Sequence, residues 1–96
     1  MRNVFLVSYD ICNDKRLRKV YKAMRGYGDH LQFSVFRCEL SEREKAEMIA
    51  ELSPLIAHDE DQVLVINIGP ADGRANVVFE SLGKPYVAPE RHAMIV

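Results

Sequence analysis

Residues 4–25 read VFLVSYDICNDKRLRKVYKAMR, an apolar run followed at once by a charged segment. The run from Val4 to Ile11 is closed by Asp10, a pattern that predicts a central β-strand. Asn13 or Asp14 can cap a following helix, because these side chains accept hydrogen bonds from the first free amides. Four apolar residues at helical spacing give this helix one buried stripe: Leu17, Val20, Tyr21 and Met24. A strand joined directly to an amphipathic helix predicts helices packed on a sheet.

A second strand and a second helix are predicted downstream. The segment HLQFSVFRCEL, residues 30–40, alternates between two faces and predicts a single strand. Ser41 and Glu44 form an S-x-x-E capping box that opens the second helix. Pro54 should end or bend that helix near Ser53. Its buried side is expected to comprise Met48, Ile49, Leu52 and Ile56.

The last third of the chain predicts two more strands, Gln62–Gly69 and Asn76–Gly83. Residues 84–96 form a tail with an apolar tip, AMIV, that nothing else in the chain is left to pair with. The order β-α-β-α-β-β fits a two-layer sandwich with helices on one face of a sheet. With 96 residues, the chain fits one domain spanning positions 1–96.

The composition predicts the cellular location of the protein and the redox state of its cysteines. No apolar run approaches the roughly 20 residues that a membrane span needs, and the N-terminal segment reads as a strand and not as a signal peptide. A cytoplasmic protein without membrane contact is therefore expected. Cys12 and Cys38 lack the tight spacing of a zinc site and are expected to be buried, reduced thiols.

Charge is distributed in opposed blocks, although the net charge is only −1. Between Lys15 and Arg25 there are six basic residues and no acid, whereas Glu39 to Asp61 holds eight acids. Opposed blocks of this kind predict one face for anions and another turned away from them.

Asp10 is the best-marked candidate for chemistry. A carboxylate at the end of a strand lies at a sheet mouth, where α/β domains place ligands. Mg²⁺ takes one or two carboxylates and binds phosphate oxygens, so a single Asp10 supplies half of a metal site. In a dimer with a two-fold axis nearby, the Asp10 of the second chain could supply the other half. The alternative is a turn aspartate that caps the loop. Asp14 could be a second carboxylate, but helix capping explains it more simply.

The basic helix is the second candidate. Arg18, Lys22 and Arg25 form one row beside the apolar stripe, with Lys19 further outward and Arg16 on the opposite flank. Like charges this dense repel each other unless a polyanion is nearby, and arginine suits bidentate phosphate contacts. Contact with nucleic acid is one interpretation, and a solvated face is the other.

As a set, the segments VSYDI, DKRLRKVYKAM, QFSVF and HDEDQVLVINIG resemble the CRISPR-associated protein 2 family over essentially the whole chain. The resemblance implies an α+β, ferredoxin-like two-layer sandwich with an antiparallel sheet, and a homodimer whose partner receives the tail. The usual order of that fold has two strands where residues 30–40 predict one, which leaves a bend within that segment or a different strand order open. It also implies a Mg²⁺-dependent endonuclease, and a dimer that holds DNA while the CRISPR integrase subunit inserts new spacers.

Individual residues match the family pattern. Asp10 matches the metal-binding, catalytic aspartate at the dimer centre, and the supporting positions are Tyr9, Ser34 and Phe36. The basic residues at the helix start are Arg16 and Arg18, and the whole nucleic-acid-binding set is expected to be Arg16, Arg18, Lys19, Lys22 and Arg25. His30 departs from the pattern, because related sequences often carry arginine there.

The leading hypothesis is a homodimeric nucleic-acid-binding subunit of CRISPR adaptation that binds duplex DNA or single-stranded RNA. A non-catalytic DNA-binding scaffold, in which Asp10 only shapes the interface, is the first alternative. A small ribonuclease toxin of related fold and a ligand-binding regulatory module are two others.

Overall fold

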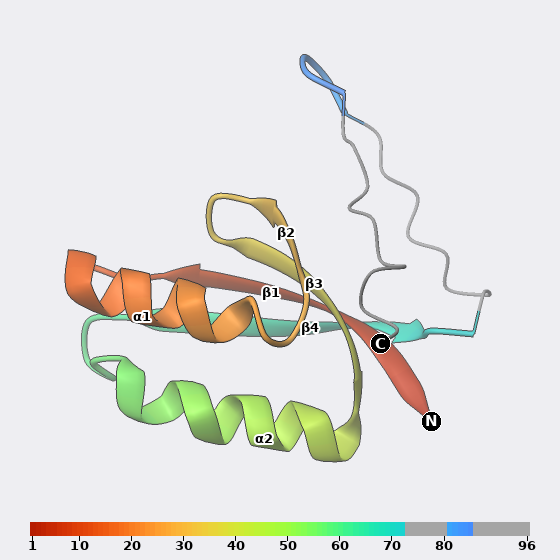
Figure 1. Cartoon of the computed structure of the whole chain (residues 1–96), viewed down its shortest axis with the longest axis horizontal. Coiled ribbons are helices and arrows are strands. Elements are labelled where there is room, and N and C mark those ends of the chain that lie inside the picture. The colour runs from red at the N-terminus through yellow and green to blue at the C-terminus, as the bar shows by residue number, and fades with distance from the viewer. Residues whose placement is uncertain (73–80, 86–96) are drawn as a thin grey trace.

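The computed structural model describes residues 1–72 and 81–85, and residues 2–70 hold a sheet with two helices on one of its faces (Figure 1). The elements are β1 (Arg2–Asp10), α1 (Asp14–Met24), β2 (Asp29–Gln32), β3 (Val35–Ser41), α2 (Glu42–Leu52), the 3₁₀ turn η1 (Ser53–Leu55) and β4 (Gln62–Pro70). All pairings are antiparallel and the strand order is β2-β3-β1-β4. This arrangement confirms the predicted α+β, ferredoxin-like sandwich.

Both helices begin at the predicted caps. The side chain of Asn13 accepts a hydrogen bond from the backbone amide of Arg16 at 3.0 Å. At α2, Ser41 Oγ accepts from the Glu44 amide at 3.1 Å while Glu44 Oε1 accepts from the Ser41 amide at 2.8 Å. The reciprocal capping box was readable because its two members lie three residues apart.

The core lies between the sheet and the helices. Every second residue of β1 and β3 points into it, which is the two-residue period of a strand. Its buried members are Phe5, Val7, Tyr9, Val20, Met24, Phe36, Cys38, Leu40, Met48 and Leu52. The predicted stripe of α1 is confirmed, with Val20 and Met24 buried and Leu17 and Tyr21 packed against them.

The single strand predicted over residues 30–40 is wrong, because a hairpin divides it. β2 ends at Gln32, Phe33 and Ser34 form the turn, and β3 begins at Val35. Two-residue hairpin turns usually carry Gly, Asn or Asp, and this turn has neither these residues nor proline. Ser34 was expected to lie in a strand, but it lies in the turn.

Four smaller expectations also need correction or fall outside the described residues. Ile49 was expected to be buried but is 45% exposed. Cys12 is exposed, whereas Cys38 is buried, and both are free thiols. The strand predicted over 76–83 and the tail over 84–96 lie mostly outside the described residues; within them, residues 81–83 form no strand.

Among the described residues, no helix covers the sheet face opposite α1 and α2, which is called the open face below. Leu64 and Ile66 of β4 pair in register with Ser8 and Leu6 of β1, so these side chains share that face. Leu64 and Ile66 are each 47% exposed. Among the described residues, neither helix is long and apolar enough to cross a membrane.

Candidate functional site

Asp10 is the last residue of β1 and is exposed. Because Tyr9 is buried toward the helices, Asp10 points to the opposite, open face, and its register partner there is Gln62 of β4. The carboxylate therefore shares a face with Leu64 and Ile66, at the end of β1 that leads into α1.

The loop after Asp10 is held in place by Asp61, which directly precedes β4. Asp61 accepts hydrogen bonds from the backbone amides of Cys12 at 2.9 Å and Ala57 at 2.8 Å. It also accepts from Arg16 Nε at 2.8 Å, and its side chain is completely shielded from solvent. One carboxylate thus joins the β1–α1 loop, the first turn of α1 and the segment before β4.

The Arg16–Asp61 pair perturbs both groups in the expected directions. The hydrogen bond from Arg16 and the two backbone amides hold the pKa of Asp61 well below its usual range, since they stabilise the carboxylate. The same hydrogen bond raises the pKa of Arg16. The guanidinium also contacts Glu60 Oε1 at 3.1 Å. Arg16, predicted to bind nucleic acid, therefore already has two carboxylate partners within the chain.

Sequence reasoning missed the role of Asp61. The available signal was the acidic HDED turn in a chain with a basic helix, but the partners lie 45 positions apart. The acidic block was expected to form a separate face, turned away from the anions that the basic face would bind. That expectation is wrong at Glu60 and Asp61, which pair with the first turn of α1.

The remaining cations of α1, together with Arg25 at its C-cap, form an exposed surface. Its members, called the cationic face below, are Lys15, Arg18, Lys19, Lys22 and Arg25. None of the five forms an ion pair with another residue that the structure describes; Arg25 lies over the ring of Tyr21, 5.9 Å from its centroid. The charges of α2 differ, because Arg43 pairs with Glu47 and Lys45 with Glu42 along the helix. A helix surface of one sign attracts anions.

The three supporting residues lie together beside the end of β1. The backbone amide of Tyr9 donates to the carbonyl of Ser34 at 3.1 Å. The rings of Tyr9 and Phe36 stack with centroids 6.2 Å apart, and both side chains are buried. The structure therefore groups Tyr9, Ser34 and Phe36, whereas Asp10 and the cationic face lie on opposite sides of the sheet.

A divalent metal could find only part of a site in one chain. Within residues 1–72 and 81–85, no three side chains of His, Cys, Asp or Glu come together as ligands. Asp10 is exposed and offers one carboxylate, and Mg²⁺ uses one or two and keeps several waters. The residue fits such an ion if a second chain contributes its own Asp10.

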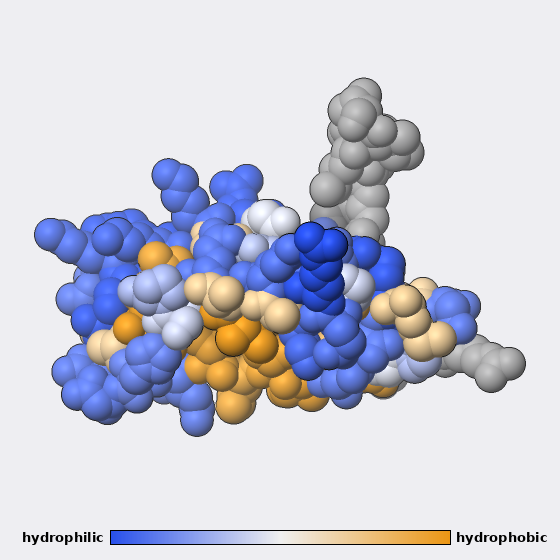
Figure 2. Space-filling view, turned by 90° about the horizontal axis from the view of Figure 1, so that it is seen from below, coloured by the Kyte–Doolittle hydropathy of each residue, from blue (hydrophilic) through white to orange (hydrophobic). Residues whose placement is uncertain are grey.

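Apolar surface gathers in one area on the side of the molecule seen from below (Figure 2). A groove of about 380 Å³ lies beside the edge strand β4, and its apolar lining comes from Ile49, Leu52, Ile56, Val63 and Val65. Within the described residues, β4 pairs only with β1, so its other edge carries unpaired backbone groups.

The sequence and the fold are both similar to known proteins. The family model described as CRISPR associated protein Cas2 matches residues 2–74. CRISPR-associated endoribonuclease Cas2 1 of Rhodospirillum rubrum is 42% identical over 94 residues, which cover 98% of this chain and 91% of that protein. CRISPR-associated endoribonuclease Cas2 of Geobacter sulfurreducens is 40% identical over 96 residues, which cover 100% of both. The crystal structure of Streptococcus pyogenes Cas2 at pH 6.5 matches with a TM-score of 0.70 and 30% identity, covering 83% of this chain and 99% of that one.

Proposed function

Because this chain belongs to the CRISPR-associated protein Cas2 family, we propose that it is a homodimeric nucleic-acid-binding subunit of CRISPR adaptation. It would hold nucleic acid in the cytoplasm while the CRISPR integrase subunit inserts new spacers. The observation that carries this proposal is the cationic face of α1, whose five exposed cations have no described ionic partner. Cations on one helix surface are suited to neighbouring phosphates.

The proposed homodimer rests on two apolar surfaces beside β4. Leu64 and Ile66 expose apolar surface on the open face, and the groove beside Ile49 and Val65 flanks the edge of the strand. Exposed apolar surface next to an unpaired strand edge favours association with a second chain. An isologous contact over the open face would bring the two Asp10 residues toward one axis.

Mg²⁺-dependent hydrolysis of a phosphodiester is the activity proposed for that axis. A bound Mg²⁺ would polarise the phosphate and promote attack by water. The part of this chain would be to hold the ion through Asp10, whose loop Asp61 fixes through Cys12. The relatives from R. rubrum and G. sulfurreducens are named endoribonucleases, so RNA is proposed as a substrate beside DNA.

Binding is tested by titrating the protein with a labelled duplex and with DNA and RNA single strands at several salt concentrations. Affinity should fall steeply as salt rises, because cation–phosphate contacts release counterions. Unrelated sequences should bind almost equally, since phosphate contacts carry no base information. Absence of binding, or binding that does not respond to salt, would contradict the proposal.

Cleavage is tested with Asp10→Asn, which keeps the size of the side chain and removes its charge. Mg²⁺-dependent cleavage should disappear, whereas Asp14→Asn, a matched change four residues along, should leave it intact. Circular dichroism checks that both variants fold. Equal cleavage by Asp10→Asn and the unaltered protein would make Asp10 a turn residue only.

A non-catalytic scaffold is the second candidate. It is favoured by the position of Asp10, which points away from the cationic face across the sheet. Salt-dependent binding without Mg²⁺-dependent cleavage by the unaltered protein would select this function.

A further inference from the structure

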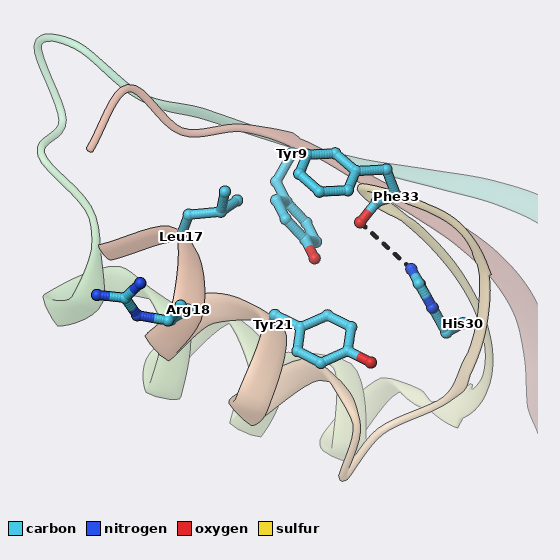
Figure 3. A pocket seen from close by; sticks show the side chains of 6 residues that line it. All are labelled: Tyr9, Leu17, Arg18, Tyr21, His30 and Phe33. Atoms are coloured by element: carbon cyan, nitrogen blue, oxygen red, sulfur yellow. Dashed lines mark hydrogen bonds between the residues drawn. The ribbon is translucent and has the colours of Figure 1, made fainter. Parts of the chain in front are cut away.

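A largely apolar cavity of about 300 Å³ lies between α1 and the β2–β3 hairpin, on the helix-bearing side of the sheet. Its lining residues are Tyr9, Leu17, Arg18, Tyr21, His30 and Phe33 (Figure 3). This volume lies at the lower end of the roughly 300–1,000 Å³ that small-ligand sites occupy. Four of the six lining side chains are flat rings, so the cavity suits a planar ligand.

The hydroxyl of Tyr9 marks the polar end of this cavity. The residue is only 4% exposed, and its Oη has no hydrogen-bond partner within the residues that the structure describes. In Figure 3 the hydroxyl points into the space between the other side chains. A buried polar atom without a partner is costly in a folded protein. Such an atom at a cavity wall indicates a ligand that supplies the missing hydrogen bond.

The hydroxyl is available as a donor at neutral pH. Burial, and secondarily Tyr21, raise the pKa of Tyr9 above its usual value of 10.0. The protonated phenol can donate to a ring nitrogen or carbonyl oxygen and can also accept one hydrogen bond.

Phe33 supplies a stacking surface at the mouth. It is 76% exposed, which is unusual for a large aromatic side chain. The turn that presents it is tied back to β2, because His30 Nε2–H donates to the carbonyl of Phe33 at 3.3 Å. Arg18, a member of the cationic face, stands at the rim with its guanidinium turned outward (Figure 3).

We propose that this cavity binds one unstacked nucleobase of a single strand whose backbone lies on the cationic face. The base would stack on Phe33 and place its hydrogen-bonding edge against Tyr9, while the adjacent phosphate would meet Arg18. The apolar rings suit the flat faces of a base, the buried hydroxyl suits its hydrogen-bonding edge, and the cation at the rim suits the phosphate. This site rests on the proposed nucleic-acid binding and deepens it, because it would distinguish single strands from duplexes.

The test uses full-length protein and single strands of DNA and of RNA, each carrying one 2-aminopurine, a fluorescent base. Binding should quench this base, and Phe33→Ala should weaken single-strand binding by about 5- to 150-fold, the contribution of one stacked base. Binding of a duplex of equal length, and its salt dependence, should stay unchanged. Comparing the DNA and RNA strands identifies which of them supplies the base.

Tyr9→Phe tests the hydroxyl separately. It should weaken single-strand binding by about 2- to 12-fold, as expected for one hydrogen bond. The variant should nevertheless melt at or above the temperature of the unaltered protein, because a buried polar atom without a partner has been removed. Tyr27→Phe is the matched control: its hydroxyl bonds Glu51 at 2.6 Å, outside the cavity, and its loss should not alter binding.

The outcomes separate this site from the proposed function. If the unaltered protein shows no salt-dependent binding to any nucleic acid, the proposed function fails and this site fails with it. If salt-dependent binding is present but 2-aminopurine is not quenched, or if Phe33→Ala weakens duplex and single strand equally, the cavity does not receive a base.

Discussion

Asp61 accounts for the order of the loop that carries Asp10 into α1. Its oxygens satisfy two backbone amides and one guanidinium: those of Cys12 and Arg16 lie 49 and 45 positions away in sequence, and the amide of Ala57 lies four positions away. A buried carboxylate is tolerable only with several such partners, and here the partners are the candidate site's own loop and helix. Asp61 therefore positions the loop of the candidate site, and because its oxygens are already occupied by these contacts, it is not itself a candidate catalytic or metal-binding residue.

Replacing Asp61 with Asn should destabilise the protein at neutral pH and change its response to acid. The folded-state pKa of Asp61 lies below its ordinary value of 3.8. Its contribution to stability is therefore complete above that pH and is lost as the pH falls toward the lower folded-state pKa. Urea unfolding should show a large difference between the two proteins at neutral pH and a much smaller one in strong acid.

Glu60→Gln is the control for that experiment. Glu60 binds the same guanidinium but is exposed, so water competes with the contact. Its loss should have a far smaller effect at every pH. A difference between Asp61→Asn and the unaltered protein that did not shrink in acid would mean that shape, and not charge, holds the loop.

At the scale of elements, structural features that depend on neighbouring residues could be predicted from the sequence. Features that depend on contacts between distant residues could not. The helix starts at Asn13 and Ser41 were readable, because each cap acts within three residues. The turn at Phe33 and Ser34 was not, since apolar alternation runs through it without a turn-forming residue. The pairing of Arg16 with Asp61 also escaped prediction, because no local pattern joins positions 45 apart.

The connection from α1 to β2 depends on close approach to β3. A Cβ on Gly28 would lie 2.4 Å from the carbonyl oxygen of Arg37 and 2.5 Å from Cys38 Sγ. Gly28→Ala should therefore cost about 1–3 kcal/mol, the usual effect of overpacking. At Gly26 the nearest such atom is 3.4 Å away, so Gly26→Ala should be neutral or slightly stabilising. Equal stability of the two variants in thermal unfolding would contradict this account.

The cationic face should act as a unit. Changing Arg18, Lys22 and Arg25 to Gln would remove up to roughly six phosphate contacts per dimer and make the salt dependence of duplex binding less steep by as much as about 5 units. Gln retains helix propensity, so circular dichroism should not change. Arg43→Gln with Lys45→Gln is the control, because those cations are paired on α2. An unchanged slope in the triple variant would mean that nucleic acid binds elsewhere.

For the whole molecule, the sheet separates the surface proposed to bind nucleic acid from the surface proposed to bind a second chain. The cationic face, Phe33 and the cavity at Tyr9 lie on the helix-bearing side, whereas Asp10, Leu64 and Ile66 occupy the open side. If a second copy covers the open side, both helices of each chain remain outside for nucleic acid. Binding and association can then be altered independently.

That independence gives the last prediction. Leu64→Asp with Ile66→Asp puts two charges on the open face, and desolvating them in an apolar interface would be costly. Sedimentation should change from twice the 11.0 kDa mass of one chain to that of a single chain. Ala50→Glu adds charge on the exposed side of α2 and should leave the dimer intact. The monomer should also lose Mg²⁺-dependent cleavage, because its Asp10 has no counterpart, while quenching of 2-aminopurine by Phe33 should persist. A dimer that withstands both substitutions would place the interface away from the open face and separate Asp10 from any two-fold axis.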